Sequence, residues 1–174
     1  MSALVIVMGV SGSGKSVLAE SLAEVTGWQF AEGDNYHSPA NKARMAARIP
    51  LTDEERLPWL NALRDVLEGW HRQRLCGILT CSALRSAYRE HLSAGLPEVR
   101  FIWLDPPREL IEERLSRRSG HFMPPELLDS QLATLEPPSG SGGSATVFRL
   151  DGSEPRQEAV AKILAWLRSE HLID

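Results

Sequence analysis

The 174-residue sequence contains only two cysteines, Cys76 and Cys81, too few for a disulfide framework or a zinc site with paired ligands. It also lacks a long apolar run, since the longest spans residues 3–8, far short of the roughly 20 residues that cross a bilayer. No basic segment precedes that run, so we expect neither a secretory signal nor a membrane partner. The sequence therefore predicts a protein of the reducing cytoplasm, in which both cysteines are inert packing residues.

Basic charge is also in short supply, because 19 Lys and Arg residues against 23 Asp and Glu residues leave a net charge of −4 at pH 7. That balance does not favour nucleic acid as a partner, and any anionic ligand must be held by local positive charge. Hydrophobic residues make up 43% of the chain and charged residues 24%, which is ordinary for a protein that buries a core. We therefore expect residues 1–174 to form a single globular domain.

Short apolar runs alternate with helical patterns along the chain. The predicted strands are residues 4–8, 28–31, 77–80, 100–104 and 146–150, and the predicted helices are residues 15–25, 53–74, 84–92, 107–118 and 154–171. Near-continuous apolar character in the first and fourth strands indicates burial on both faces, as in a parallel sheet. This order predicts an α/β fold of three layers, with helices on both faces of a five-stranded parallel sheet.

Two segments interrupt this alternation. Residues 38–51 lie between a strand and a long helix and carry Lys42, Arg44 and Arg48, whereas residues 117–138 are rich in proline. Insertions on a rigid sheet commonly carry function or move as lids. We expect the first segment to be a substrate-side insertion and the second to be a lid, with a flexible Gly/Ser loop after it at 139–144.

Residues 9–16 read G-V-S-G-S-G-K-S and match the phosphate-binding motif G-x-x-x-x-G-K-[ST] at every fixed position. The motif directly follows a predicted strand and opens a predicted helix, which is the setting it requires. Its glycines let the backbone form a nest of N–H groups around phosphate oxygens, and the helix adds its positive end. Lys15 would reach the β- and γ-phosphates of ATP, and the Ser16 hydroxyl would bind Mg²⁺. The predicted nucleotide-binding residues of this loop are Gly9, Ser11, Gly12, Ser13, Gly14, Lys15 and Ser16.

Three absences favour a phosphotransferase over a nucleotide switch. No D-x-x-G occurs, so the turn with which switch GTPases sense the γ-phosphate is missing. Asn41-Lys42-Ala43-Arg44 lacks the Asp of a guanine-reading N-K-x-D. The third predicted strand ends in Thr80-Cys81-Ser82, without an acidic residue. The carboxylate that supports Mg²⁺ must therefore come from elsewhere, and the candidates are Glu32, acting through water, and Asp34.

Glu32-Gly33-Asp34 ends the second predicted strand, and ligands of open α/β sheets bind at that edge. Asp34 near a γ-phosphate would accept a proton from an attacking hydroxyl, and His37 lies just beyond it. Because Gly-Asp-Asn is also ordinary turn chemistry, a solvated turn is the alternative for this segment.

Arginines supply the local positive charge. Arg114, Arg117 and Arg118 fall at i, i+3 and i+4, so they share a helix face, and Glu113 can pair with Arg117. Such a cluster favours phosphate oxygens as ligands, with a solvated helix end as the alternative. Arg85 and Arg89 lie one helical turn apart and either hold a substrate anion or form a surface pair.

These residues resemble the gluconokinases, which are small P-loop kinases related to shikimate and nucleoside monophosphate kinases. Besides the phosphate loop, the resemblance rests on Gly33-Asp34-x-x-His37, Cys81-Ser82-Ala83-Leu84-Arg85 with Tyr88-Arg89, Gly120-His121-Phe122, and Ser130-Gln131. Such markers run in order from residue 8 to about residue 136, so the resemblance covers most of the chain.

The resemblance implies ATP-dependent phosphorylation of D-gluconate at its 6-hydroxyl, with Mg²⁺, by a cytoplasmic homodimer. Lys15, Asp34 and Arg117 would be catalytic, and Arg114, Arg117 and Arg118 would bind the nucleotide from the lid side. The substrate residues would be Asp34, His37, Lys42, Arg56, Arg85, Arg89 and His121, and the sequence does not choose which basic residue holds the carboxylate. A kinase for another small acid such as shikimate, or a P-loop switch without a small substrate, remains as an alternative.

Overall fold

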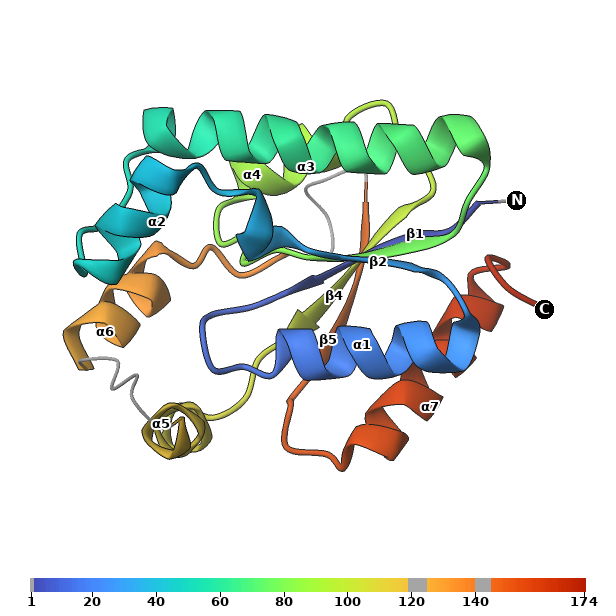
Figure 1. The fold of residues 1–174 in the computed structure, drawn as a ribbon. Helices are drawn as coiled ribbons and strands as arrows, with labels where there is room; N and C mark the ends of the chain where they lie inside the picture. The colour runs from blue at the N-terminus through green and yellow to red at the C-terminus, as the bar shows by residue number, and fades with distance from the viewer. Residues whose placement is uncertain (1, 119–124, 140–144) are drawn as a thin grey trace.

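A computed structural model describes residues 2–118, 125–139 and 145–174, which build a five-stranded parallel sheet (Figure 1). The strand order is β2-β3-β1-β4-β5. The strands are β1 Leu4–Met8, β2 Gln29–Glu32, β3 Gly77–Thr80, β4 Val99–Leu104 and β5 Thr146–Leu150. The predicted α/β fold is therefore confirmed, with β2 shifted by one residue and β4 starting one residue earlier than expected.

The central strand β1 explains the position of the phosphate loop. All five of its residues are buried, and it pairs with β3 through Val7 and Thr80 and with β4 through Met8 and Trp103. Because the strands are parallel, their carboxyl ends meet at one edge of the sheet. The loop that leaves β1 therefore emerges between the ends of β3 and β4, where α/β folds place their ligands.

Helices cover both faces of the sheet, as predicted. The helices are α1 Lys15–Thr26, α2 Pro39–Ala46, α3 Asp53–Gln73, α4 Ser86–Ser93, α5 Arg108–Arg117, α6 Pro125–Thr134 and α7 Arg156–Ser169. On one face, Val7 packs in a cluster with Leu22 of α1 and Ile163 of α7. On the other face, Ile6 packs in a cluster with Leu63 of α3. Alternating β1 side chains thus join the three layers, and Figure 1 shows α1 and α7 opposite α3 and α4.

Helix α3 begins where its capping box requires. The Glu55 N–H donates to Thr52 Oγ1 at 3.2 Å, and the Thr52 N–H donates to Glu55 Oε2 at 2.8 Å. This reciprocal pair satisfies two amide groups that a helix start otherwise leaves without partners. The box also fixes the first turn of α3, which carries Asp53 and Arg56 toward the carboxyl edge of the sheet.

The segments expected as insertion and lid each contain a helix that the sequence analysis did not predict. Ser38 caps α2 by accepting from the Asn41 N–H at 3.1 Å, and Asn41 Nδ2 donates to the Glu55 carbonyl of α3 at 2.8 Å. After α6, the Glu136 N–H donates to the Leu84 carbonyl at 2.8 Å. Helices α2, α5 and α6 lie at the end of the sheet away from the chain termini (Figure 1). None of the helices in the described ranges is long and apolar enough to cross a membrane.

Candidate active site

The phosphate loop adopts the conformation that its glycines permit. Gly9 has a φ of 145°, and a Cβ there would lie 2.6 Å from the Leu104 carbonyl oxygen, so only glycine fits against β4. Gly14, with a φ of 97°, precedes the first residue of α1 in a left-handed conformation that other residues rarely adopt. The Gly9 N–H also donates to the Ser82 carbonyl at 3.3 Å, which ties the loop to the end of β3. The loop is thus held between two strand ends, with the N-terminus of α1 directly after it.

Lys15 is folded back over this loop. Its Nζ donates to the Val10 carbonyl at 2.9 Å, so the ammonium lies inside the turn that the loop makes. Desolvation by burial lowers the pKa of Lys15, while the carboxylates of Asp34 and, more weakly, Glu32 act to raise it. Lys15 and Asp34 come from different strand ends, and both line one cavity.

A serine hydroxyl in the loop fits an anionic ligand. Ser13 is 1% exposed, and its Oγ has no hydrogen-bond partner within the described part of the chain. A buried hydroxyl without a partner is costly, and a phosphate oxygen would satisfy it. Ser16 is half-buried on the first turn of α1, where the phosphate-loop motif places a Mg²⁺ ligand. The loop residues therefore fit a nucleotide phosphate chain with its metal ion.

The turn after β2 is fixed by a close backbone contact. A Cβ on Gly33 would lie 1.9 Å from the Thr80 carbonyl oxygen, so this position accepts only glycine. The Thr80 hydroxyl accepts from the Gly33 N–H at 3.0 Å and donates to Glu32 Oε1 at 2.5 Å. The Gly33 carbonyl accepts from Trp59 Nε1 at 2.8 Å. Asp34 therefore lies on a short 3₁₀ helix, Gly33–Tyr36, directly after β2. Hydrogen bonds hold the start of this helix to β3 through Thr80 and to α3 through Trp59.

His37 lies at the end of this turn and stacks on Trp59, with ring centroids 4.2 Å apart and an interplanar angle of 15°. Burial lowers the pKa of His37, and the nearby Asp34 carboxylate only partly opposes it. The neutral imidazole is therefore the dominant form at pH 7. Its Nδ1 is buried without a hydrogen-bond partner among the described residues, which suits contact with a hydroxyl of a ligand.

A cavity of about 240 Å³ joins the phosphate loop to the turn after β2. Residues of α2, α3 and α6, or of the segments beside them, close its other sides. The charged and polar side chains of the wall include Lys15, Asp34, His37, Arg48, Arg56 and Gln131. The cavity therefore presents the phosphate-loop lysine, a carboxylate, a neutral imidazole and two guanidinium groups to a single ligand.

Helix α6 reaches the phosphate loop through Gln131, which the sequence analysis did not select as a site residue. Gln131 Oε1 accepts from the Ser11 N–H at 2.8 Å, and its Nε2 donates to Ser11 Oγ at 3.2 Å. Ser130-Gln131 was visible in the sequence only as a family marker. Arg48, a basic residue of the insertion, also lines the cavity, and no motif in the sequence indicates this position.

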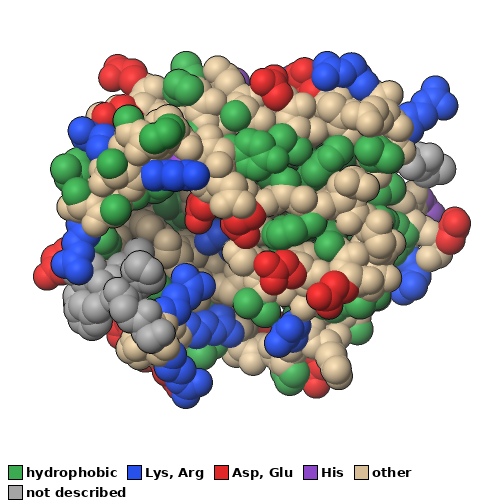
Figure 2. Space-filling view, in the orientation of Figure 1, with side chains coloured by type: hydrophobic (Ala, Val, Ile, Leu, Met, Phe, Trp, Pro, Cys, Tyr) green, Lys and Arg blue, Asp and Glu red, His purple; other side chains and the backbone are tan. Residues whose placement is uncertain are grey.

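Of the three clustered arginines, Arg114 contacts the phosphate loop. Its guanidinium donates to the Ser13 carbonyl at 2.9 Å and to the Gly152 carbonyl at 2.7 Å. Arg117 is mainly exposed and pairs with Glu113, as the sequence indicated. Arg118 directly follows α5 in an exposed position, yet its charge helps to lower the pKa of Lys15. Figure 2 shows Lys and Arg side chains gathered over α5, at the same end of the molecule.

The other predicted substrate residues are divided by the structure. Arg56 lines the cavity, whereas Lys42, Arg85 and Arg89 do not. Lys42 is exposed on α2, and Arg85 pairs with Asp53 at 2.9 Å. His121 lies outside the described residues.

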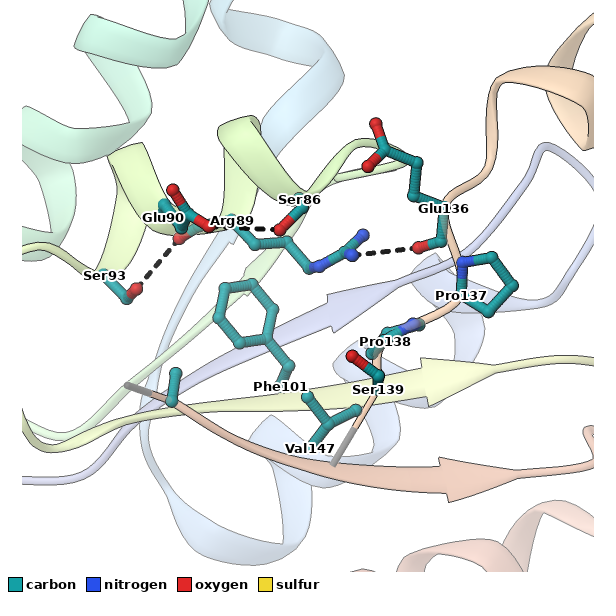
Figure 3. A pocket seen from close by; sticks show the side chains of 11 residues that line it. Ser86, Arg89, Glu90, Ser93, Phe101, Glu136, Pro137, Pro138, Ser139 and Val147 are labelled. Atoms are coloured by element: carbon teal, nitrogen blue, oxygen red, sulfur yellow. Dashed lines mark hydrogen bonds between the residues drawn. The ribbon is translucent and has the colours of Figure 1, made fainter. Parts of the chain in front are cut away.

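Arg89 has a structural use in this arrangement. It is 9% exposed, and its guanidinium donates to the Ala83, Leu84 and Glu136 carbonyls at 2.8, 3.2 and 2.9 Å. Figure 3 shows the side chain between α4 and the segment that follows α6. Three main-chain acceptors use much of its donor capacity, so Arg89 holds the chain after α6 against the start of α4.

Comparison with known proteins decides the family. Residues 4–138 match a family model described as an AAA domain. A gluconokinase from Gluconobacter oxydans is 41% identical over 165 residues, covering 95% of this chain and 91% of that protein. The chain belongs to the gluconokinase family. A thermosensitive gluconokinase from Escherichia coli is 44% identical over 146 residues, covering 84% of this chain and 77% of that protein.

Solved structures agree with this placement. A gluconokinase from Sinorhizobium meliloti superposes with a TM-score of 0.83 at 41% identity, covering 96% of this chain and 92% of that chain. A sugar kinase from Janibacter sp. gives a TM-score of 0.88 at 45% identity, covering 97% and 95%. A shikimate kinase from Aquifex aeolicus, at 19% identity and a TM-score of 0.56, shares the fold. The gluconokinase resemblance and the P-loop kinase fold predicted from the sequence are both confirmed.

Proposed function

We propose that this chain transfers the γ-phosphoryl group of ATP to the 6-hydroxyl of D-gluconate, giving 6-phospho-D-gluconate and ADP. One observation carries the proposal: a single cavity has the phosphate-loop Lys15 and the Asp34 carboxylate in its wall. Phosphoryl transfer needs a donor phosphate and an acceptor hydroxyl held in line at such a junction. The names of the 41–44% identical relatives supply gluconate as the acceptor.

The donor end of the site suits ATP. The N–H groups of residues 9–16 and the positive end of α1 would hold the β- and γ-phosphates. The buried Ser13 Oγ would donate to a phosphate oxygen, and Lys15 would move its hydrogen bond from the Val10 carbonyl to the phosphates. Ser16 would hold Mg²⁺, with Glu32 acting through water. The metal ion, when bound, neutralises charge on the phosphate oxygens.

The acceptor end suits a polyhydroxy acid. Asp34 would orient the 6-hydroxyl and accept its proton as the new ester bond forms. His37, kept neutral by burial, would contact a hydroxyl group farther along the substrate. Of the four basic residues left open by the sequence, Arg56 is the one in the cavity wall. We therefore assign the carboxylate of gluconate to Arg56, because a guanidinium matches a carboxylate with two parallel N–H donors.

The segment 117–138 would act as a lid. Its described part holds α6, whose Gln131 already contacts Ser11 of the phosphate loop. Arg117 is exposed at the end of α5 and would turn toward the reacting phosphates when the lid closes. Such closure excludes water from the transferred group. In this scheme Arg114 keeps the loop in shape, and Arg117 and Arg118 add positive charge during transfer.

A coupled ADP-release assay tests the proposal. The assay would compare D-gluconate with other sugar acids and with shikimate, at fixed ATP and Mg²⁺. We expect kcat/KM to be highest for D-gluconate, and Lys15→Ala to abolish turnover while its circular dichroism stays that of the folded protein. Equal, low rates across the panel would favour a nucleotide-binding module, and a preference for shikimate would replace the substrate.

The family resemblance also implies that the protein is a cytoplasmic homodimer without a nucleic-acid or membrane partner. Among the described residues, no helix is long and apolar enough to span a membrane. Light scattering during size-exclusion chromatography would give the mass of the particle in solution. A mass near twice the 19.3 kDa of one chain is expected, and a mass of one chain would contradict the dimer.

A further inference from the structure

Arg56 enters the cavity from a fixed part of the backbone. It lies on the first turn of α3, where its N–H donates to the Thr52 carbonyl at 3.0 Å. Its side chain is 23% exposed. A long arginine side chain has many rotamers, and ordering it on binding costs conformational entropy. A contact that already orders the guanidinium would therefore improve the binding of a carboxylate.

Such a contact comes from Tyr88 of α4. Arg56 Nη1 donates to the Tyr88 hydroxyl oxygen at 2.9 Å, and the guanidinium carbon lies 5.7 Å from the centre of the tyrosine ring. Tyr88 is 7% exposed, so its ring is held by the core between α3 and α4. The hydroxyl contacts one nitrogen of the guanidinium, which carries further N–H donors on Nε and Nη2.

The direction of this hydrogen bond is set by Asp53. The Tyr88 hydroxyl donates its single proton to Asp53 Oδ1, so its oxygen is left as an acceptor for Arg56. Asp53 Oδ2 accepts from Arg85 Nη1 at 2.9 Å, which fixes the carboxylate from its other side. The hydrogen bond from Tyr88 lowers the pKa of Asp53, and burial together with this bond raises the pKa of Tyr88. At neutral pH the donor and the acceptor therefore keep these roles.

We propose that Tyr88, oriented by Asp53, is a positioning residue that holds the Arg56 guanidinium toward the cavity for recognition of the substrate carboxylate. The inference rests on the proposed function, because it requires an acidic substrate. It also gives Arg85 a role different from direct contact with the substrate: Arg85 secures Asp53. The chain Arg85–Asp53–Tyr88–Arg56 thus connects the start of α4 to the acceptor end of the cavity.

Tyr88→Phe removes only the hydroxyl group and is the main test. We expect the KM for D-gluconate to rise on the order of tenfold, as for a lost hydrogen bond to a charged group, with kcat and the KM for ATP nearly unchanged. Tyr36→Phe is the matched control, because the sequence has two tyrosines and Tyr36 is exposed on the turn after β2, outside the cavity wall. It should leave all three constants unchanged.

A double-mutant cycle separates positioning from a merely structural role. Arg56→Ala should raise the KM for D-gluconate more than Tyr88→Phe does, and adding Tyr88→Phe to Arg56→Ala should raise it no further. Asp53 Oδ1 also lies 3.6 Å from Arg56 Nη1, so Asp53→Ala removes this ion pair together with the acceptor that orients Tyr88, and it should raise the KM at least as much as Tyr88→Phe does. Thermal unfolding would confirm that each variant is folded under the assay conditions.

Different results would contradict the proposed gluconate kinase activity and the positioning role of Tyr88. If wild-type protein does not phosphorylate gluconate, the proposed function fails before the cycle begins. If it does and Arg56→Ala leaves the gluconate KM unchanged, the assignment of the carboxylate to Arg56 is wrong. If Tyr88→Phe raises the KM by the same factor with and without Arg56, Tyr88 does not act through Arg56 and the positioning role is overturned.

Discussion

Replacing Asp34 with Asn tests the chemistry of the cavity, because the change keeps the size of the side chain and removes its charge. Asp34 is anchored by a turn that Gly33 and Trp59 fix, so the amide should occupy the same place. General-base assistance contributes about 10²–10⁴-fold to a rate, and the loose transition state of phosphoryl transfer favours the lower part of that range. We expect kcat to fall by about 10²-fold while ATP affinity changes little.

The structure adds a second consequence of this substitution. The Asp34 carboxylate is the strongest of the charges that raise the pKa of Lys15 against the effect of burial. Its removal must therefore lower the pKa of Lys15 further, so the ammonium loses its proton at a lower pH. The KM for ATP of Asp34→Asn should accordingly begin to rise at a lower alkaline pH than that of the wild type.

The assay is kcat measured across a Mg²⁺ titration, together with calorimetric ATP binding. Glu32→Gln is the matched control, because Glu32 accepts from Thr80 and is the expected partner of Mg²⁺ through water. Its damage should shrink as Mg²⁺ is raised, whereas that of Asp34→Asn should not. Recovery of Asp34→Asn at high Mg²⁺ would assign Asp34 to the metal ion, and an unchanged kcat would remove it from the mechanism.

Three further changes test the lid, the contact of α6 with the phosphate loop, and the burial of His37. Arg117→Ala should lower kcat more than it raises the KM for ATP, since its contact forms mainly in the transition state; steady-state kinetics showing a KM effect alone would refute this. Gln131→Glu puts a negative charge beside Ser11 and should weaken ATP binding on the order of tenfold, and calorimetry should show a smaller effect for Gln131→Met. Because burial lowers the pKa of His37 from 6.5, the unfolded chain binds more protons than the folded one below that pH, so stability should fall there. Urea unfolding between about pH 5 and 8 should show a weaker dependence for His37→Gln.

Much of the fold was predictable because periodicity and capping are local signals. The apolar run of β1 predicts a buried strand, and the Thr52–Glu55 capping box predicts the start of helix α3. Each signal lies within a few consecutive residues. Helices α2 and α6 were missed because both are short and each begins with a proline. Their stability comes from contacts such as Asn41 with the Glu55 carbonyl, which depend on residues distant in sequence.

The candidate site was predictable where a motif fixes the backbone and less so where the fold brings side chains together. The phosphate loop and the Gly33–Asp34 turn needed only their own residues and their places after strands. Arg89 resembled a substrate residue in sequence, yet the turn at Ala83, with a φ of 45°, points carbonyl groups at its guanidinium. The contact of Gln131 with the phosphate loop could not be predicted without knowing that α6 packs over Ser11, which lies 120 residues earlier in the chain.

Cys81 follows the sequence prediction of an inert packing residue. It is 2% exposed, and burial raises the pKa of its thiol to about 12. A thiol rather than a thiolate therefore stands at the end of β3 at neutral pH, and only thiolates react readily. The basic groups that act on Lys15 at the carboxyl edge of the sheet are therefore the carboxylates of Asp34 and Glu32.

In the proposed reaction, one cavity joins the phosphate of ATP to the 6-hydroxyl of D-gluconate. Phosphorus NMR of the reaction of wild-type protein with ATP, Mg²⁺ and D-gluconate tests it most directly. We expect one phosphomonoester, formed in equal amount to ADP, whose phosphorus couples to the two protons on carbon 6. Release of inorganic phosphate without an ester, or an ester on another carbon, would contradict it.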